Sequence, residues 1–166
     1  MATSTTERGP LTGYFIWRLA LKWRAEVDRV LAPLDLTQAE YSLLASLAGL
    51  SRAGKKPSQR ELSDFSGLEP MYVSKLARAL EEDGLLERAT NSADPRAFRL
   101  TLTDRGAAIL DAAYASVRQL QDRLLLPLGD WEDPRRTEFK QTLEALLRHA
   151  EELDAPVLVA ATTQET

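Results

Sequence analysis

Three residues that suit contacts to a nucleic acid recur at helical spacing in the middle of the chain. Met71, Lys75 and Arg78 are separated by four and three residues, which places them on one face of a helix. Lys and Arg donate hydrogen bonds to guanine O6 and N7 or to phosphate, and an apolar side chain contacts the thymine methyl group. Tyr72 and Ser74 flank this face and offer hydroxyl groups. The pattern therefore predicts a helix face that reads the major groove of DNA.

The charge distribution of the chain is less informative than this motif. The 166 residues include 21 Lys and Arg against 25 Asp and Glu, a net charge of −4 that argues weakly against a nucleic-acid binder. Between Arg52 and Arg105, however, ten basic residues accompany nine acidic ones. Taken alone, such a mixture is typical of a solvated surface. The interpretation as a DNA-binding surface therefore depends on the elements that position the basic residues.

A short helix is predicted just before the basic face. Residues 58–61 read Ser-Gln-Arg-Glu, a capping box that begins a helix. Leu62 and Phe65 are expected to be its inward residues, and Ser66 and Gly67 to end it. The sequence therefore predicts a tight turn before the next helix.

The helix that carries the basic face has clear start and stop signals. Glu69 stands at the cap position and Pro70 at the first helical position, where the missing amide hydrogen costs nothing. We expect this helix to run to Asp83 and to stop at Gly84. Its predicted inward residues are Val73, Leu76, Ala77 and Leu80. Two helices joined by a tight turn predict a helix-turn-helix.

A two-stranded hairpin is predicted directly after this pair of helices. Residues 85–88 and 98–103 suit strands, and the turn-forming composition of residues 89–97 predicts a long loop between them. Arg96 in that loop suits a narrow minor groove, where the potential is most negative. Asp94, two residues earlier, is able to pair with the guanidinium and hold its direction. The order of helix, turn, helix and hairpin predicts a winged helix-turn-helix.

Four further helices are expected around this unit. Apolar spacing of three and four predicts long helices over residues 11–31, 104–126 and 134–153. A capping box at Thr37 begins another helix, which we expect to end before Gly49. The long helices exceed what a small core requires, and the sequence therefore predicts helical surfaces beyond the winged unit.

Several classes of activity are excluded by composition. The chain has no Cys and one His, His149, so thiol redox sensing, Cys-ligated zinc sites and multi-His sites are excluded, and no metal site is expected. It has no phosphate loop, no His-Glu-x-x-His motif and no nucleophile elbow, so we expect no catalytic site and no cofactor. Apolar runs such as residues 124–128 are far shorter than the roughly 18 residues that span a membrane. The chain is therefore expected to act in the cytoplasm, without a membrane partner.

Two adjoining segments carry a resemblance to a known family. ELSDFSGLEPMYVSKLARALEEDGLLER at residues 61–88, followed by DPRAFRLTLTDRG at residues 94–106, resembles the MarR family, the multiple antibiotic resistance regulators. The resemblance implies a mainly α fold with a small β-hairpin wing. It also implies a winged helix-turn-helix domain with a helical dimerisation region from the first, fifth and sixth helices. A homodimer would then place its recognition helices in successive major grooves.

The resemblance also implies domain boundaries. A MarR-type domain is expected over residues 11–153, with the winged helix-turn-helix core at residues 37–103. The dimerisation helices are those at residues 11–31, 104–126 and 134–153, and residues 1–10 and 154–166 are expected to be flexible tails. Many members of the family release DNA when a small, often aromatic or phenolic, ligand binds between these two regions.

The candidate DNA contacts follow from the motif and the resemblance together. Family members usually carry a small residue where this chain has Glu69, and a carboxylate there would repel a nearby phosphate or cap the helix instead. Lys55, Lys56 and Arg60 either touch phosphates at the groove edge or form a solvated basic loop. The residues expected to contact DNA are Ser58, Gln59, Met71, Tyr72, Ser74, Lys75, Arg78, Asp94 and Arg96.

A pocket for an effector is the second site that the resemblance implies. Aromatic side chains from several helices, with a basic residue to match a carboxylate, are suited to bind such a ligand. The same side chains are equally suited to packing in the core or a dimer interface. The candidate effector residues are Tyr14, Trp17, Arg18, Tyr41 and Tyr114.

The sequence therefore predicts a dimeric, ligand-responsive transcriptional regulator. Its expected partners are double-stranded DNA, a second copy of the chain and an unidentified small-molecule effector. Such a protein would act as a repressor on a pseudo-palindromic operator. The alternative is a winged-helix scaffold that binds protein or small molecules without reading DNA, which the negative net charge and Glu69 favour.

Overall fold

A computed structural model of the chain describes residues 11–54, 56–91 and 94–154, without the side chains of residues 91, 94–97 and 154. The predicted tails at residues 1–10 and 154–166 lie outside the described residues except for Asp154, which ends the last helix. The chain divides into two compact units, residues 1–120 and 121–166.

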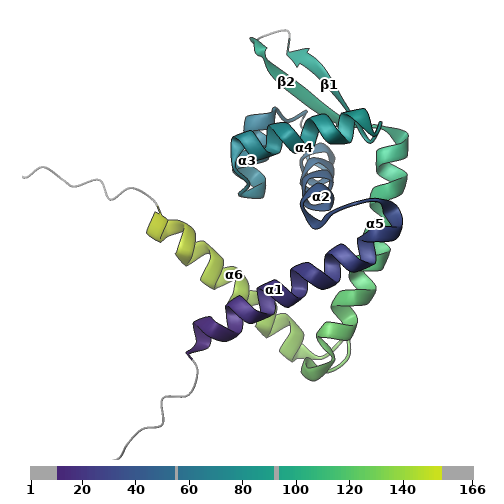
Figure 1. Cartoon of the computed structure of the whole chain (residues 1–166). Coiled ribbons are helices and arrows are strands. Elements are labelled where there is room, and N and C mark those ends of the chain that lie inside the picture. The colour runs from purple at the N-terminus through teal and green to yellow at the C-terminus, as the bar shows by residue number, and fades with distance from the viewer. Residues whose placement is uncertain (1–10, 55, 92–93, 155–166) are drawn as a thin grey trace, which may run out of the picture. The chain divides into compact units, whose positions relative to one another are not determined.

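Helices make up most of both units (Figure 1). In the described part of the chain the sheet is one antiparallel hairpin, which belongs to the first unit. This arrangement confirms the predicted mainly α fold with a hairpin wing. The elements are α1 (Thr12–Leu31), η1 (Ala32–Leu34), α2 (Gln38–Arg52), α3 (Gln59–Ser66), α4 (Pro70–Glu82), β1 (Leu86–Asn91), β2 (Asp94–Leu102), α5 (Asp104–Leu124), η2 (Leu126–Leu128) and α6 (Pro134–Asp154).

Both predicted capping boxes are present. The Thr37 hydroxyl accepts from the Glu40 amide at the start of α2, and the Glu40 carboxylate accepts from the Thr37 amide at 2.8 Å. The same reciprocal pair forms between Ser58 and Glu61 at the start of α3. Each box satisfies amide groups that have no partner within the helix, so the helix start is set locally.

The end of α2 differs from the prediction. The helix does not stop before Gly49 but continues to Arg52, and the backbone turns at Gly54, whose φ of 76° suits glycine. Leu50, beyond Gly49, is buried in the core. Burial of this leucine offsets the cost of one glycine inside a helix, about 1 kcal/mol, so the local break signal is overridden.

The core of the first unit is built mainly from leucines on α1, α2, α4, the hairpin and α5. The inward face predicted for α4 is confirmed, because its four apolar residues are buried. The prediction that Phe65 of α3 points inward is wrong, because this side chain is 59% exposed. Ser63 takes the inward position instead, and its hydroxyl donates to the Leu68 carbonyl at 2.6 Å. Leu62 and Ser63, rather than Phe65, therefore face the core.

The hairpin strands are longer than predicted. β1 and β2 pair from Leu86 with Leu102 to Asn91 with Asp94, so most of the expected loop at residues 89–97 belongs to the strands. The register becomes irregular between Thr90 and Asn91. An isolated ribbon needs no alternation of apolar residues near its tip, which is why composition suggested a loop there.

The start of α5 contacts the turn that follows α4, at Gly84 and Leu85. The Thr103 hydroxyl accepts from the Gly106 amide at 2.9 Å, as its predicted capping role requires, and donates to the Gly84 carbonyl at 2.8 Å. Gly106 is buried, and a Cβ atom built on it would lie 1.8 Å from the Leu85 carbonyl oxygen. Only glycine therefore fits at this position.

The second unit is organised by one arginine. The Arg136 side chain donates to the Asp122 carboxylate at 2.9 Å and to the carbonyl groups of Asp122 and Gly129 at 3.0 and 3.1 Å. These bonds join the two ends of the connection between α5 and α6. His149 lies on the exposed surface of α6, 3.6 Å from Glu152. No helix in the described ranges is long and apolar enough to cross a membrane.

Two helical glycines, the buried Gly106 and the half-buried Gly49, give a matched stability test. Gly106→Ala is expected to destabilise the protein by about 2 kcal/mol or more, because its methyl group overlaps the Leu85 backbone. Gly49→Ala is expected to stabilise it by up to about 1 kcal/mol, because the nearest atom, on Phe65, is 4.0 Å away. Urea unfolding followed by circular dichroism at one protein concentration measures both. Equal stability of the two variants would contradict the close approach.

Candidate nucleic-acid interface

The exposed face of α4 carries the predicted basic residues. Met71 is 84% exposed, and Lys75 and Arg78 are also exposed. The opposite face of the helix is buried, so its orientation in the unit is set by packing. Glu69 is the residue before the helix, but its side chain forms no capping hydrogen bond, and the capping role considered for it is wrong. A long Glu side chain is less suited than Ser or Asp to reach the first amides.

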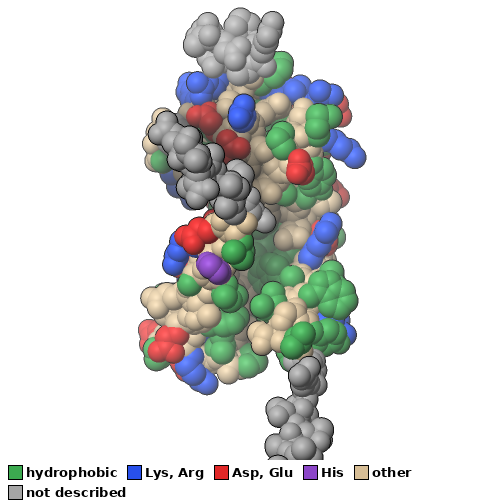
Figure 2. Space-filling view, turned by 90° about the vertical axis from the view of Figure 1, so that its left-hand side faces the viewer, with side chains coloured by type: hydrophobic (Ala, Val, Ile, Leu, Met, Phe, Trp, Pro, Cys, Tyr) green, Lys and Arg blue, Asp and Glu red, His purple; other side chains and the backbone are tan. Residues whose placement is uncertain are grey.

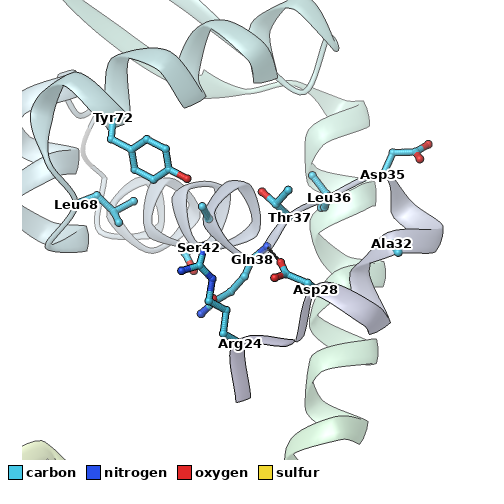
Figure 3. Close-up of a pocket in the computed structure, with 11 residues that line it drawn as sticks. Arg24, Asp28, Ala32, Asp35, Leu36, Thr37, Gln38, Ser42, Leu68 and Tyr72 are labelled. Atoms are coloured by element: carbon cyan, nitrogen blue, oxygen red, sulfur yellow. Dashed lines mark hydrogen bonds between the residues drawn. The ribbon is translucent and has the colours of Figure 1, made fainter. Parts of the chain in front are cut away.

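Tyr72 and Ser74 lie on the flanks of this face, as expected from their spacing. Tyr72 is 40% exposed, and Ser74 is half-buried. Successive residues of a helix are rotated by about 100°, so Tyr72 points to a different side from Met71. The Tyr72 ring projects into a pocket beside α2 (Figure 3). The structure thus separates Tyr72 from the row formed by Met71, Lys75 and Arg78.

The start of α3 holds the two other helical candidates. The Ser58 hydroxyl donates to the Glu61 carboxylate at 2.9 Å and accepts from the Glu61 amide at 3.2 Å, so it is occupied by the capping box. The side-chain amide nitrogen of Gln59 is buried and has no hydrogen-bond partner among the described residues. Their contact with DNA stays a prediction.

One strand of the wing is tied to the end of α4. The Arg88 guanidinium on β1 donates to the Glu81 carboxylate of α4 at 2.6 Å and lies over the Phe98 ring of β2, 5.1 Å from its centroid. The Arg88 side chain is only 18% exposed. A partly buried ion pair that also stacks on an aromatic ring restrains the hairpin relative to α4.

The other strand is tied to the start of α3. The Leu100 amide of β2 donates to the Pro57 carbonyl at 3.0 Å. The Arg99 side chain donates to the Lys56 carbonyl and lies 3.5 Å from the Glu61 carboxylate. The wing is therefore anchored to both helices of the helix-turn-helix. Figure 1 shows the base of the hairpin beside α4.

Asp94 and Arg96 lie on β2, close to the tip of the hairpin. Their side chains are outside what the structure describes. Their expected pairing, and the expected contact of Arg96 with the minor groove, stay predictions.

A pocket of about 520 Å³ lies beside this interface, between α1, η1, the start of α2 and the start of α4 (Figure 3). Arg24 and Asp28 of α1 form one side, and Leu68 and Tyr72 form another. The Asp28 carboxylate accepts from the Gln38 amide at 2.7 Å, so it is already used to cap α2. Arg24 is exposed and has no ion pair with any other described residue. Its guanidinium is therefore a cation available to an anionic ligand.

The five residues predicted to line an effector pocket form two separate groups. Tyr14, Trp17 and Arg18 gather on α1, where Arg18 donates to the Tyr14 hydroxyl at 3.0 Å. Tyr41 of α2 and Tyr114 of α5 pack edge to face with their ring centroids 5.9 Å apart. Burial, and to a smaller extent the neighbouring Tyr114, raise the pKa of the Tyr41 phenol. These contacts are compatible with a packing role for the five residues.

The residues around the 520 Å³ pocket are different from those five. Sequence reasoning missed Arg24 and Asp28, because the helix at residues 12–31 carries six charged residues and no local signal distinguishes these two. Leu68 and Tyr72 reach the pocket only because the turn between α3 and α4 folds next to α2. No local pattern predicts that approach.

Comparisons with known proteins agree with this geometry. A sequence model of the MarR family matches residues 36–98. The chain is 31% identical over 143 residues to the uncharacterised HTH-type transcriptional regulator YdcH of Bacillus subtilis, which covers 85% of this chain and 94% of that protein.

Several solved structures of similar chains contain bound DNA or a bound small molecule. The transcriptional repressor CouR, bound to a 23-mer DNA duplex, is 29% identical with a TM-score of 0.72, covering 90% of this chain and 99% of that one. A MarR-family protein of Mycobacterium tuberculosis in complex with salicylic acid is 32% identical with a TM-score of 0.63, covering 84% and 98%. The chain therefore belongs to the MarR family of transcriptional regulators, which are DNA-binding proteins and not enzymes.

Proposed function

We propose that this protein is a repressor that binds a pseudo-palindromic operator as a homodimer and leaves it when a small aromatic anion binds. The observation that carries the proposal is the exposed row of Met71, Lys75 and Arg78 on a helix whose other face is buried. A helix of this kind fits the major groove, where Arg and Lys donate to guanine and Met contacts thymine. The wing is anchored to α3 and α4, and this anchoring supports the proposal that it enters the adjacent minor groove.

The DNA-bound structure of the similar repressor CouR supports this proposal. Asp94 and Arg96 remain the proposed wing contacts, with Arg96 in the minor groove and Asp94 orienting it. Because DNA is the proposed partner, the proposed place of action is the cytoplasm, where bacteria such as Bacillus subtilis keep their DNA.

Arg78→Ala and Lys75→Ala are expected to weaken operator binding by about 1 to 3 kcal/mol where the lost contact is to a base. The measurement is fluorescence anisotropy on DNA from upstream of the gene, at about 50 and 200 mM salt. Six to ten phosphate contacts would cost wild type about 10³ to 10⁵ in affinity over that range.

The matched control is Arg29→Ala, an arginine on α1 whose side chain is 70% exposed and pairs only within its own helix. It should bind like wild type. Unchanged affinity in both α4 variants would remove this face from the DNA interface. Equal and weak binding of wild type to operator and scrambled duplexes would instead favour a scaffold without DNA readout.

Exposed apolar residues support the homodimer. On α1, Phe15 and Trp17 are each 57% exposed, and on α6 Leu146 and Leu147 are 52% and 63% exposed. Figure 2 shows hydrophobic side chains at the surface over both helices. Such patches are typical of surfaces that a partner covers, and a second copy of the chain is the partner that a symmetric DNA site requires.

Leu147→Glu is therefore expected to weaken self-association by about tenfold or more, since it places a charge in an apolar contact. Sedimentation equilibrium over a range of concentrations measures the dissociation constant. Lys140→Gln is the matched control on the same helix, because Lys140 is 75% exposed and pairs with Glu144. A wild-type protein that sediments as a monomer throughout would refute the homodimer, and normal association of Leu147→Glu would exclude α6 from the interface.

The pocket beside α4 supports the ligand response. It combines the unpaired Arg24 guanidinium with the ring of Tyr72 and the apolar side chain of Leu68, a set that suits an aromatic carboxylate. The salicylate complex of the similar Mycobacterium tuberculosis protein makes salicylate a suitable probe. We propose that such a ligand binds here.

Arg24→Ala is expected to raise the salicylate concentration that releases operator DNA by about tenfold or more, because a charge-assisted hydrogen bond is lost. Competition anisotropy with preformed protein–DNA complex measures this shift. Arg29→Ala, five residues further along α1, should keep the wild-type response. An unchanged response of Arg24→Ala would place the ligand elsewhere.

A further inference from the structure

The start of α4 carries a carboxylate that the fold leaves unused. Glu69 is exposed and directly precedes Pro70. Its side chain forms no capping bond, and no ion pair or side-chain hydrogen bond joins it to another described residue. At the starts of α2 and α3, by contrast, the capping side chains are fully engaged. Glu69 is therefore a charged group without a structural role at the end of a proposed recognition helix.

This end of α4 is the part that base edges would meet. Recognition helices contact bases mainly through their N-terminal residues. Met71, two residues after Glu69, is 84% exposed, the largest exposed fraction among the large apolar side chains that the structure describes. Insertion of Met71 into the major groove would bring the Glu69 carboxylate within one helical turn of the same base pairs.

The chemistry of a carboxylate restricts what it meets there. An ionised carboxylate only accepts hydrogen bonds. Guanine and thymine offer acceptors in the major groove, adenine offers its amino group beside the N7 acceptor, and cytosine offers its N4 amino group as a donor. Phosphate carries the same sign of charge. A carboxylate that gives up its hydration water and then faces another acceptor has no hydrogen-bond donor, which costs free energy. It therefore disfavours DNA sequences that place an acceptor beside it.

We propose that Glu69 is a specificity-determining residue that accepts a hydrogen bond from the N4 amino group of a cytosine in the operator half-site. The inference rests on the proposed function, because it requires α4 to enter the major groove. Lys75 and Arg78 attract DNA of any sequence as well as guanine, whereas Glu69 rejects sequences that lack a donor at its position. The carboxylate thus lowers non-specific affinity and raises selectivity.

Selection of binding sites from a random duplex library, followed by sequencing, tests this role in the full-length protein. The proteins compared are wild type, Glu69→Gln, Glu69→Ser and the control Glu82→Gln, an exposed glutamate at the other end of α4. Wild type and Glu82→Gln should select cytosine at one position of each half-site. Glu69→Gln should select adenine there, because Gln pairs with adenine N6 and N7, and Glu69→Ser should lose the preference.

Affinities for single duplexes complete the test. Replacing that C·G pair by T·A should weaken wild-type binding by about tenfold or more and Glu69→Ser binding by less than about twofold. Glu69→Ser should also bind scrambled DNA more tightly than wild type, because a negative charge near phosphates is removed.

The possible failures are distinguishable. If wild type selects a site but the Glu69 variants select the same bases at every position, the role of Glu69 is refuted and the proposed function stands. The same holds if the bases that change do not include a cytosine in the wild-type site. If wild type selects no sequence at all, both proposals fail. A merely structural role would shift the affinity for all sequences together and leave the selected base unchanged.

Discussion

Burial of one face of α4 is the constraint on which the proposed DNA-binding surface depends. Val73, Ala77 and Leu80 are completely buried, so rotation of the helix would expose side chains whose burial contributes roughly 1.5 to 3 kcal/mol for each larger one. The helical repeat then directs Lys75 and Arg78 toward solvent. The residues that hold the recognition face in place are therefore residues that never touch a ligand.

The wing depends on the same helix and on its neighbour. Arg88 joins β1 to the end of α4, and Arg99 joins β2 to the start of α3 through Glu61 and the Lys56 carbonyl. Partly exposed ion pairs of this kind contribute little to stability, but they restrict the direction of an otherwise isolated ribbon. The capping box at the start of α3 consequently serves both the helix and the wing.

The pocket and the recognition face share the first turn of α4. Tyr72 lines the pocket, while the adjacent Met71 lies on the exposed face. Because the backbone of a helical turn is rigid, a displacement of the backbone at Tyr72 also moves Met71. The proposed ligand response and DNA contact are thus linked through neighbouring residues, with Arg24 of α1 on the far side of the pocket.

Local signals in the sequence predict the winged helix-turn-helix and the exposed row on α4, because capping boxes and helical spacing act within a few residues. Packing decided the features that depend on distant residues. Leu50 is buried where α2 continues past Gly49, and on α3 Ser63 is buried while Phe65 is exposed. The pocket at Arg24 likewise exists only where α1, α2 and the start of α4 meet, so no single segment encodes it.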